Sequence, residues 1–133
     1  RLGLSSTLLS YIGNDQNGKD CLMELQKNNV DTQYVRMEDG KKTNYHYVLW
    51  YDVDRTILVK HEKFKYDLGD INTPKWIYLS SLGEDSLSFQ EQIASFLGKH
   101  PETKLAFQPG TFQMKMGTEA LADIYKKSEI FFL

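Results

Sequence analysis

The pattern of apolar and polar positions from 8 to 35 predicts a strand, a helix and a second strand. An apolar run over 8–12 is followed by 13–18, a turn-rich sequence of the kind that ends a strand. Three residues then recur at a spacing that places them on one helical face: Cys21, Leu22 and Leu25. The Asn-Asn pair at 28–29 can end this helix, because Asn tolerates the left-handed conformation. With 30–35 as a second extended segment, the unit favours an α/β layer with a parallel sheet.

The most unusual stretch is 43–51, which has no helical period and carries bulky side chains on both faces. A turn-like sequence at 52–54 and a β-rich run at 55–60 follow it. Together they predict a β-hairpin with a loop of about three to five residues. Because a hairpin lacks a crossover helix, it does not fit a parallel sheet, and we expect it to form a separate flap. The predicted parts are a β-hairpin lid, 43–61, and an α/β core segment, 1–42 and 62–133.

The second half of the chain continues the alternation of strands and helices. After a polar, loop-like stretch over 61–74, apolar runs predict strands at 76–80, 104–108 and 129–133. Asp85 or Ser86 can cap the first helix between them, Gly98 can end it, and Thr118 precedes the second. Their apolar faces are Phe89, Ile93, Phe96 and Leu97 in the first, and Leu121, Ile124 and Tyr125 in the second. We therefore predict an α/β fold with a mostly parallel sheet, flanking helices and the hairpin.

Composition and charge narrow the classes of function. The net charge of −2 gives no bulk attraction to nucleic acid. The single cysteine, Cys21, excludes an internal disulfide, and its apolar neighbours favour a small buried helix residue over a nucleophile. No apolar run approaches the length of a membrane span and no signal peptide is visible, so we expect a cytoplasmic protein.

Both ends of the sequence suggest a segment of a longer protein. The chain opens on Arg1 rather than Met and closes on an apolar run, 130–133, that is suited to a buried strand. In open α/β sheets, ligands bind in loops beyond the carboxyl ends of the strands. We expect such a loop to follow this last strand.

Four short stretches carry a resemblance to a known family: 11–18, 29–32, 43–44 with 54–58, and 105–110. In this order they resemble the G-x-D-x-x-G segment, the "GVDT" strand entry, the lid hairpin and the strand ending in Asn-Pro-Gly of the ribokinase-like (PfkB) sugar kinases. Asn29 replaces the Gly of the second motif, and Gln108 stands where the family prefers Asn. Each motif is weak alone, but the ordered set is fairly specific and covers nearly the whole chain.

The resemblance implies transfer of a phosphoryl group from ATP, with Mg²⁺, to a hydroxyl of a sugar or nucleoside. In the family, an Asp in a later G-A-G-D segment is the general base, and this sequence lacks that segment, the early Gly-Gly hinge and the Asn-x-x-Glu segment. No catalytic residue or metal ligand can therefore be assigned. The chain alone is expected to be inactive and to supply the lid and part of the sugar side.

The candidate substrate-binding residues are Asn44, His46 and Gln108. Strand alternation places Asn44 and His46 on one face of the lid, where polar groups could meet a sugar. The alternative is that the other face lines the cleft or forms a homodimer contact: Tyr45, Tyr47, Leu49 and Tyr51. His46 has no second ligand at metal-binding spacing.

Other polar residues favour structural interpretations. Asp15 is expected to hold its turn, and Gly13 and Gly18 to serve turn geometry and close packing. Lys19 after Gly18 gives a superficial P-loop, but an acidic residue follows where Ser or Thr is needed. Arg55 is expected to pair with Asp52 or Asp54, and Lys126-Lys127 to be a solvated helix end.

Two other functions stay open. The first is a non-catalytic α/β binding or assembly module that self-associates through the aromatic hairpin, which sizing of variants with Ser at 47 and 50 would test. The second is an unrelated doubly wound nucleotide-binding domain, which a G-x-G-x-x-G after a strand would favour; no such segment appears.

Overall fold

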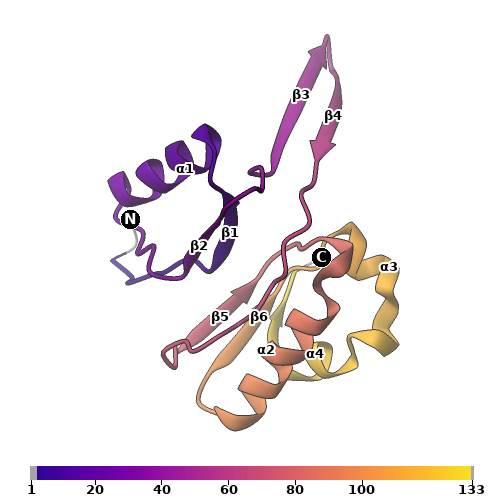
Figure 1. Ribbon diagram of the computed structural model, residues 1–133. Coiled ribbons are helices and arrows are strands. Elements are labelled where there is room, and N and C mark those ends of the chain that lie inside the picture. Colours follow the sequence, from indigo (N-terminus) through magenta and orange to yellow (C-terminus); the bar gives the residue numbers. More distant parts are fainter. Residues whose placement is uncertain (1–2, 133) are drawn as a thin grey trace. The chain divides into compact units, whose positions relative to one another are not determined.

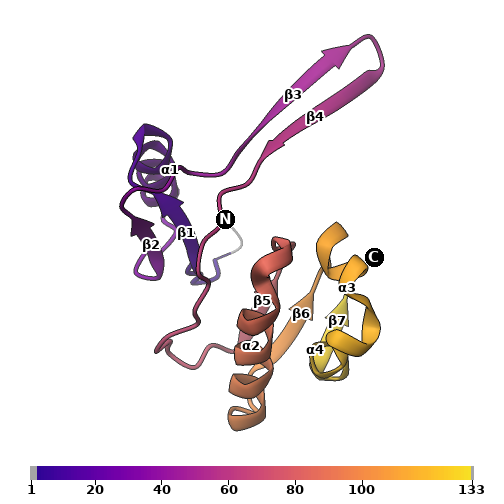
Figure 2. The same ribbon diagram turned by 45° about the vertical axis from the view of Figure 1, so that its right-hand side comes forward.

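A computed structural model describes residues 3–132 (Figures 1 and 2). The elements follow in the order β1 (Ser10–Gly13), α1 (Gln16–Lys27), β2 (Val35–Glu38), β3 (Tyr45–Tyr51), β4 (Asp54–Lys60), β5 (Trp76–Leu79), a 3₁₀ turn (Glu84–Ser86), α2 (Leu87–Lys99), β6 (Lys104–Phe107), α3 (Thr111–Ala120), α4 (Ala122–Lys127) and β7 (Ser128–Phe131). The chain divides into a first unit, 1–64, and a second unit, 65–133, and each is described by itself. The predicted division into a core segment and a lid stays a prediction.

The first unit contains the predicted strand–helix–strand arrangement. β1 and β2 pair in parallel, with Ser10 opposite Val35 and Gly13 opposite Glu38, and α1 connects them. The second strand was expected at 30–35 but begins where that segment ends. Asp31 makes only an isolated bridge to Thr7, and its carboxylate accepts the Gln33 N–H at 3.0 Å, which holds a turn before β2.

Helix α1 has the predicted end but a different buried face. Asn28 caps it and Asn29 has φ 57°, in the left-handed region, as the Asn-Asn pair predicted. The prediction of a buried Cys21 is wrong, because this residue is exposed. The less accessible stripe follows Gly18, Leu22 and Leu25, at i, i+4 and i+7, and the cysteine lies at its edge.

The hairpin of the first unit consists of β3 and β4, paired in antiparallel from Tyr45 opposite Lys60 to Tyr51 opposite Asp54. Figures 1 and 2 show it extending away from β1, β2 and α1. The loop holds two residues, 52–53, rather than the expected three to five, because Asp52 adopts φ 51° and lets the chain reverse tightly. All residues of β3 are exposed.

The second unit holds a three-stranded parallel sheet in the order β5-β6-β7. Its core lies around the central strand, where Leu105 and Phe107 are fully buried. The predicted apolar face of α2 is confirmed for the buried residues Phe89, Ile93 and Leu97. α2 and α4 pack against each other, and Leu121 and Ile124 of the last helical segment are buried as predicted.

Three local details of the second unit differ from the predictions. Ser86 occupies the N-cap position of α2 as predicted, but its hydroxyl donates to the Gly83 carbonyl at 2.6 Å and makes no capping bond. Gly98 lies inside α2, which continues to Lys99. Thr118, which was expected to precede the second helix, lies inside α3, an unpredicted helix that Gly117 interrupts at φ 83°. The order of strands and helices around these details is otherwise the predicted one, and the α/β prediction is confirmed.

Candidate functional site

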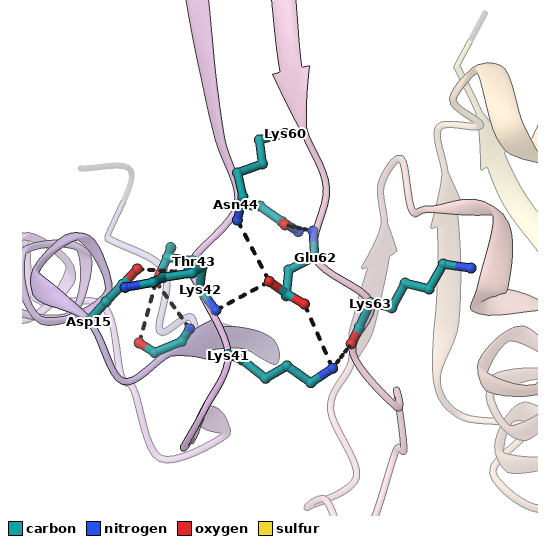
Figure 3. Close-up of polar contacts among 9 residues, drawn as sticks. Asp15, Lys41, Lys42, Thr43, Asn44, Lys60, Glu62 and Lys63 are labelled. Atoms are coloured by element: carbon teal, nitrogen blue, oxygen red, sulfur yellow. Dashed lines mark hydrogen bonds and ion pairs between the residues drawn. The ribbon is translucent and has the colours of Figure 1, made fainter.

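The root of the hairpin is held on the first turn of α1 by Asp15 and Thr43 (Figure 3). The Asp15 carboxylate accepts hydrogen bonds from the Gly18 N–H at 3.0 Å, the Thr43 hydroxyl at 2.6 Å and the Thr43 N–H at 3.1 Å. The Thr43 hydroxyl in turn accepts the Gly13 N–H at 3.0 Å. Asp15 thus caps the helix, as a structural Asp should, and also reaches a residue 28 positions away.

The two glycines of this loop permit the close approach of 41–43. A Cβ on Gly13 would lie 2.4 Å from the Lys41 carbonyl oxygen, and one on Gly18 would lie 2.1 Å from the Gly13 carbonyl oxygen. Thr43 is buried, with 4% of its surface exposed. The predicted role of both glycines in close packing is therefore confirmed.

Hydrogen bonding makes Asp15 a stronger acid than an ordinary aspartate. The bond from the Thr43 hydroxyl, followed by the Gly18 N–H, lowers the pKa of Asp15 from 3.8 to about 2. Partial burial opposes this shift, while the Thr43 N–H and the charge of Lys42 add to it. The carboxylate is charged at neutral pH and occupies the N-terminus of α1. A phosphate would meet this negative charge there, which agrees with rejection of the P-loop interpretation.

Glu62, which follows β4, joins the segment that leaves the hairpin to the segment that enters it (Figure 3). Its carboxylate lies 3.8 Å from Lys41 Nζ and 3.6 Å from Lys60 Nζ, and accepts the Lys42 N–H at 3.4 Å. The Asn44 side-chain oxygen accepts the N–H of the same glutamate. Hydrogen bonds and an ion pair therefore connect the segment that leads into the hairpin with the segment that leads out of it.

The predicted lid residues lie at this end of the hairpin. Asn44 is half-buried and bonded to the Glu62 backbone, immediately before β3. His46 is exposed, and its ring centroid is 5.8 Å from that of His61. It pairs with Val59 in the hairpin register. Substrate contact by either residue stays a prediction.

Gln108 follows β6 at the carboxyl end of the parallel sheet, where ligands bind in open α/β folds. It is exposed, and its side-chain oxygen accepts a hydrogen bond from the Tyr78 hydroxyl of β5. The structure places Gln108 in the second unit and Asn44 and His46 in the first. Its role in substrate binding also stays a prediction.

Sequence reasoning missed Gln113, which fixes the loops beyond β5 and β6. This side chain is fully buried. Its oxygen accepts the Gly110 N–H at 2.8 Å and the Leu82 N–H at 3.2 Å, and its nitrogen donates to the Ser80 carbonyl at 3.2 Å. No periodic pattern marks this residue, because it lies in the helix that the apolar pattern did not reveal. Thr43 had a weak signal, as part of the hairpin motif, and Glu62 had none.

Neither a cluster of metal-binding side chains nor a membrane-spanning helix is found among the described residues. Among residues 3–132, no group of three or more His, Cys, Asp or Glu side chains is placed to hold a metal ion. Within the same range, no helix is long and apolar enough to cross a bilayer.

Comparison with known proteins connects this arrangement to one family. The sequence model of the pfkB family carbohydrate kinases matches residues 1–101. PH1459, an uncharacterized sugar kinase of Pyrococcus horikoshii, is 35% identical over 74 residues, or 54% of this chain and 24% of that protein. An uncharacterized sugar kinase of Archaeoglobus fulgidus is 25% identical over 141 residues, or 98% of this chain and 54% of that protein.

Solved structures agree on the fold. The structure of PH1459 in complex with ATP matches with a TM-score of 0.74 at 23% identity, covering 98% of this chain and 48% of that one. A PfkB protein from Polaromonas sp. JS666 matches with a TM-score of 0.77 at 12% identity, covering 98% of this chain and 50% of that one. The predicted ribokinase-like fold is thus confirmed. The chain spans about half the length of these structures.

Proposed function

The chain belongs to the pfkB family of carbohydrate kinases, and from this premise we propose that the protein transfers a phosphoryl group from ATP to a hydroxyl of a sugar or nucleoside. The family match over residues 1–101 carries the proposal. The structure of the relative PH1459 with ATP supports ATP as the donor. Mg²⁺ is proposed from the reaction class, since ATP transfer normally uses it. By the family resemblance, the general base belongs to a G-A-G-D segment, which this sequence lacks.

Within this chain, the proposed contributions are to substrate binding. The hairpin β3–β4 is the lid, and Asn44, His46 and Gln108 face the substrate. Amide and imidazole groups both donate and accept hydrogen bonds, which suits the hydroxyls of a sugar. Gln108 lies at the carboxyl end of β6, where open α/β folds bind their ligands.

The test is a coupled assay of ADP release by the intact protein, with a panel of sugars and nucleosides. We expect turnover with at least one hydroxyl substrate. Gln108→Ala should then raise KM by about three- to tenfold, the effect of about one lost hydrogen bond. Gln26→Ala, an exposed glutamine on α1, is the matched control and should leave KM unchanged. Failure of the intact protein to bind or phosphorylate any member of a broad panel would refute the proposal.

A second candidate function is self-association through the hairpin, and one observation favours it. Tyr47 and Trp50 lie on opposite faces of β3, and 61% and 66% of their surfaces are exposed. Large apolar side chains exposed on a short hairpin are typical of a contact surface. A dimer that persists on sizing and dissociates when both residues are replaced by Ser would support this function. A monomer at all concentrations would exclude it.

A further inference from the structure

We infer that Asp15 and Thr43 form an anchor that fixes the root of the hairpin on the first turn of α1, which makes Asp15 a positioning residue for the hairpin. The anchor joins a helix N-terminus to the segment that enters β3. Thr43 is separated from the first residue of β3 by Asn44 alone. Any displacement of Thr43 therefore displaces the start of the hairpin.

The direction of the hydrogen bonds shows why the anchor needs a carboxylate. The Thr43 hydroxyl lies 2.6 Å from Asp15 Oδ1 and 3.3 Å from the Gly13 carbonyl oxygen, and it has one hydrogen to donate. The shorter bond to a charged acceptor is the stronger, so this hydrogen goes to Asp15. Asp15 Oδ2 accepts the Thr43 N–H. Thr43 thus donates one hydrogen bond to each of the two carboxylate oxygens of Asp15.

The capping and anchoring roles of Asp15 can be separated by a single change. In Asp15→Asn, the remaining oxygen can still accept the Gly18 N–H, and Asn caps helices as well as Asp does. The new NH₂ group would face the Thr43 N–H, so that two donors oppose each other. This variant keeps the helix cap and the bond from the Thr43 hydroxyl, which both use Oδ1, but it replaces the bond from the Thr43 N–H with a donor–donor contact and so weakens the anchor. Thr43→Val removes the hydroxyl from the other side, and Thr43→Ser restores it.

A distance measurement tests the anchor directly. Cys21 is the only cysteine of the chain and is exposed on α1, and Val53 in the hairpin loop is 85% exposed. Spin labels at Cys21 and at Val53→Cys report the distance between helix and hairpin tip by pulsed EPR. We expect one narrow distribution in the parent, a broad one with Asp15→Asn or Thr43→Val, and a narrow one with Thr43→Ser. Asp31→Asn, the same charge change at a local turn in the same unit, is the control.

Amide exchange gives a second measurement on the unlabelled protein. Exchange of the Thr43 amide should accelerate about fivefold or more in Asp15→Asn, as expected for about one lost hydrogen bond. The Gly18 amide should change less, because its acceptor remains. Unchanged distance distributions and exchange rates in both anchor variants would overturn the inference, as would an equal effect of Asp31→Asn. Circular dichroism identifies a variant that has unfolded, and the Thr43→Val and Thr43→Ser pair then decides.

The consequence for substrate rests on the proposed function. With a lid that is no longer positioned, Asp15→Asn should raise KM for the sugar or nucleoside more than it lowers kcat, and Thr43→Ser should stay close to the parent. If the parent protein phosphorylates nothing, the proposed function fails while the distance and exchange results still decide the anchor. If the parent is active and KM is unaffected by a broadened distribution, the anchor does not position the lid for substrate.

Discussion

At the scale of single residues, the ionisation of Asp15 makes the stability of the first unit depend on pH. Its pKa is lowered to about 2 in the folded protein, from an ordinary value of 3.8. A carboxyl with a lowered pKa stabilises the fold fully above its unfolded value and loses this contribution as the pH falls through its folded value. The window for this residue is therefore between about pH 4 and pH 2.

We predict that the stability advantage of the parent over Asp15→Asn is full at pH 5–6 and shrinks from about pH 4 towards zero near pH 2. Urea unfolding of both proteins across this range measures it. Glu102, whose pKa is lowered first by a hydrogen bond to its own backbone, is common to both proteins, so its effect is expected to cancel. An advantage that is independent of pH would contradict the assigned ionisation of Asp15.

At the scale of elements, the glycines of α2 and α3 differ in backbone conformation: Gly98 is helical and Gly117 is not. Gly98 lies in regular geometry in α2, where an added Cβ meets nothing closer than Lys127 Nζ at 3.6 Å. Gly117 interrupts α3 at φ 83° and ψ 170°, a region essentially restricted to glycine. Space is open around Gly117, so its restriction comes from the backbone alone.

The same substitution should therefore have opposite signs at these positions. Gly98→Ala is expected to stabilise the second unit by about 0.5–1 kcal/mol, because alanine loses less backbone freedom on folding. Gly117→Ala is expected to destabilise it by about 1–3 kcal/mol through backbone strain. Denaturant unfolding of both variants provides the comparison, with each serving as the control for the other. Equal effects would mean that the break in α3 is not maintained in solution.

Element prediction from the sequence succeeded where a periodic apolar face or a capping residue exists. The Asn-Asn pair located the end of α1, and the spacing of Phe89, Ile93 and Leu97 identified α2. It failed where tertiary contacts or backbone geometry decide. No regular apolar spacing marked α3, whose buried residue is Gln113, and the hydrogen bond that Asp31 accepts from Gln33 holds a turn where the second strand was expected.

At the scale of the whole molecule, the second unit has the larger core. Phe107 of the central strand is fully buried, and its ring contacts those of Tyr125 and Phe131 at centroid distances of 5.6 and 5.8 Å. Phe107→Ala should destabilise this unit by about 3–5 kcal/mol, the usual loss for a buried phenylalanine. Amide exchange of β5–β7 measures this effect. Phe132→Ala, at a residue that is 44% exposed, is the control and should have a much smaller effect.

The candidate site was harder to predict than the fold for a physical reason. The family motifs identified the hairpin and the glycine loop, because these depend on local sequence. The contacts that join them are between residues far apart in sequence, such as Asp15 with Thr43 and Lys41 with Glu62. Polar residues in such contacts have no periodicity, so only a three-dimensional structure reveals their partners.

The position of the anchor has a consequence for how this protein can diversify. Thr43 precedes β3 and Glu62 follows β4, so the contacts that attach the hairpin lie outside its paired strands, apart from the ion pair of Glu62 with Lys60. The sequence from 46 to 59 can therefore change length or character as an exchangeable cassette, while its attachment to α1 stays the same. Selection for a new ligand could act on this cassette without rebuilding the scaffold that carries it.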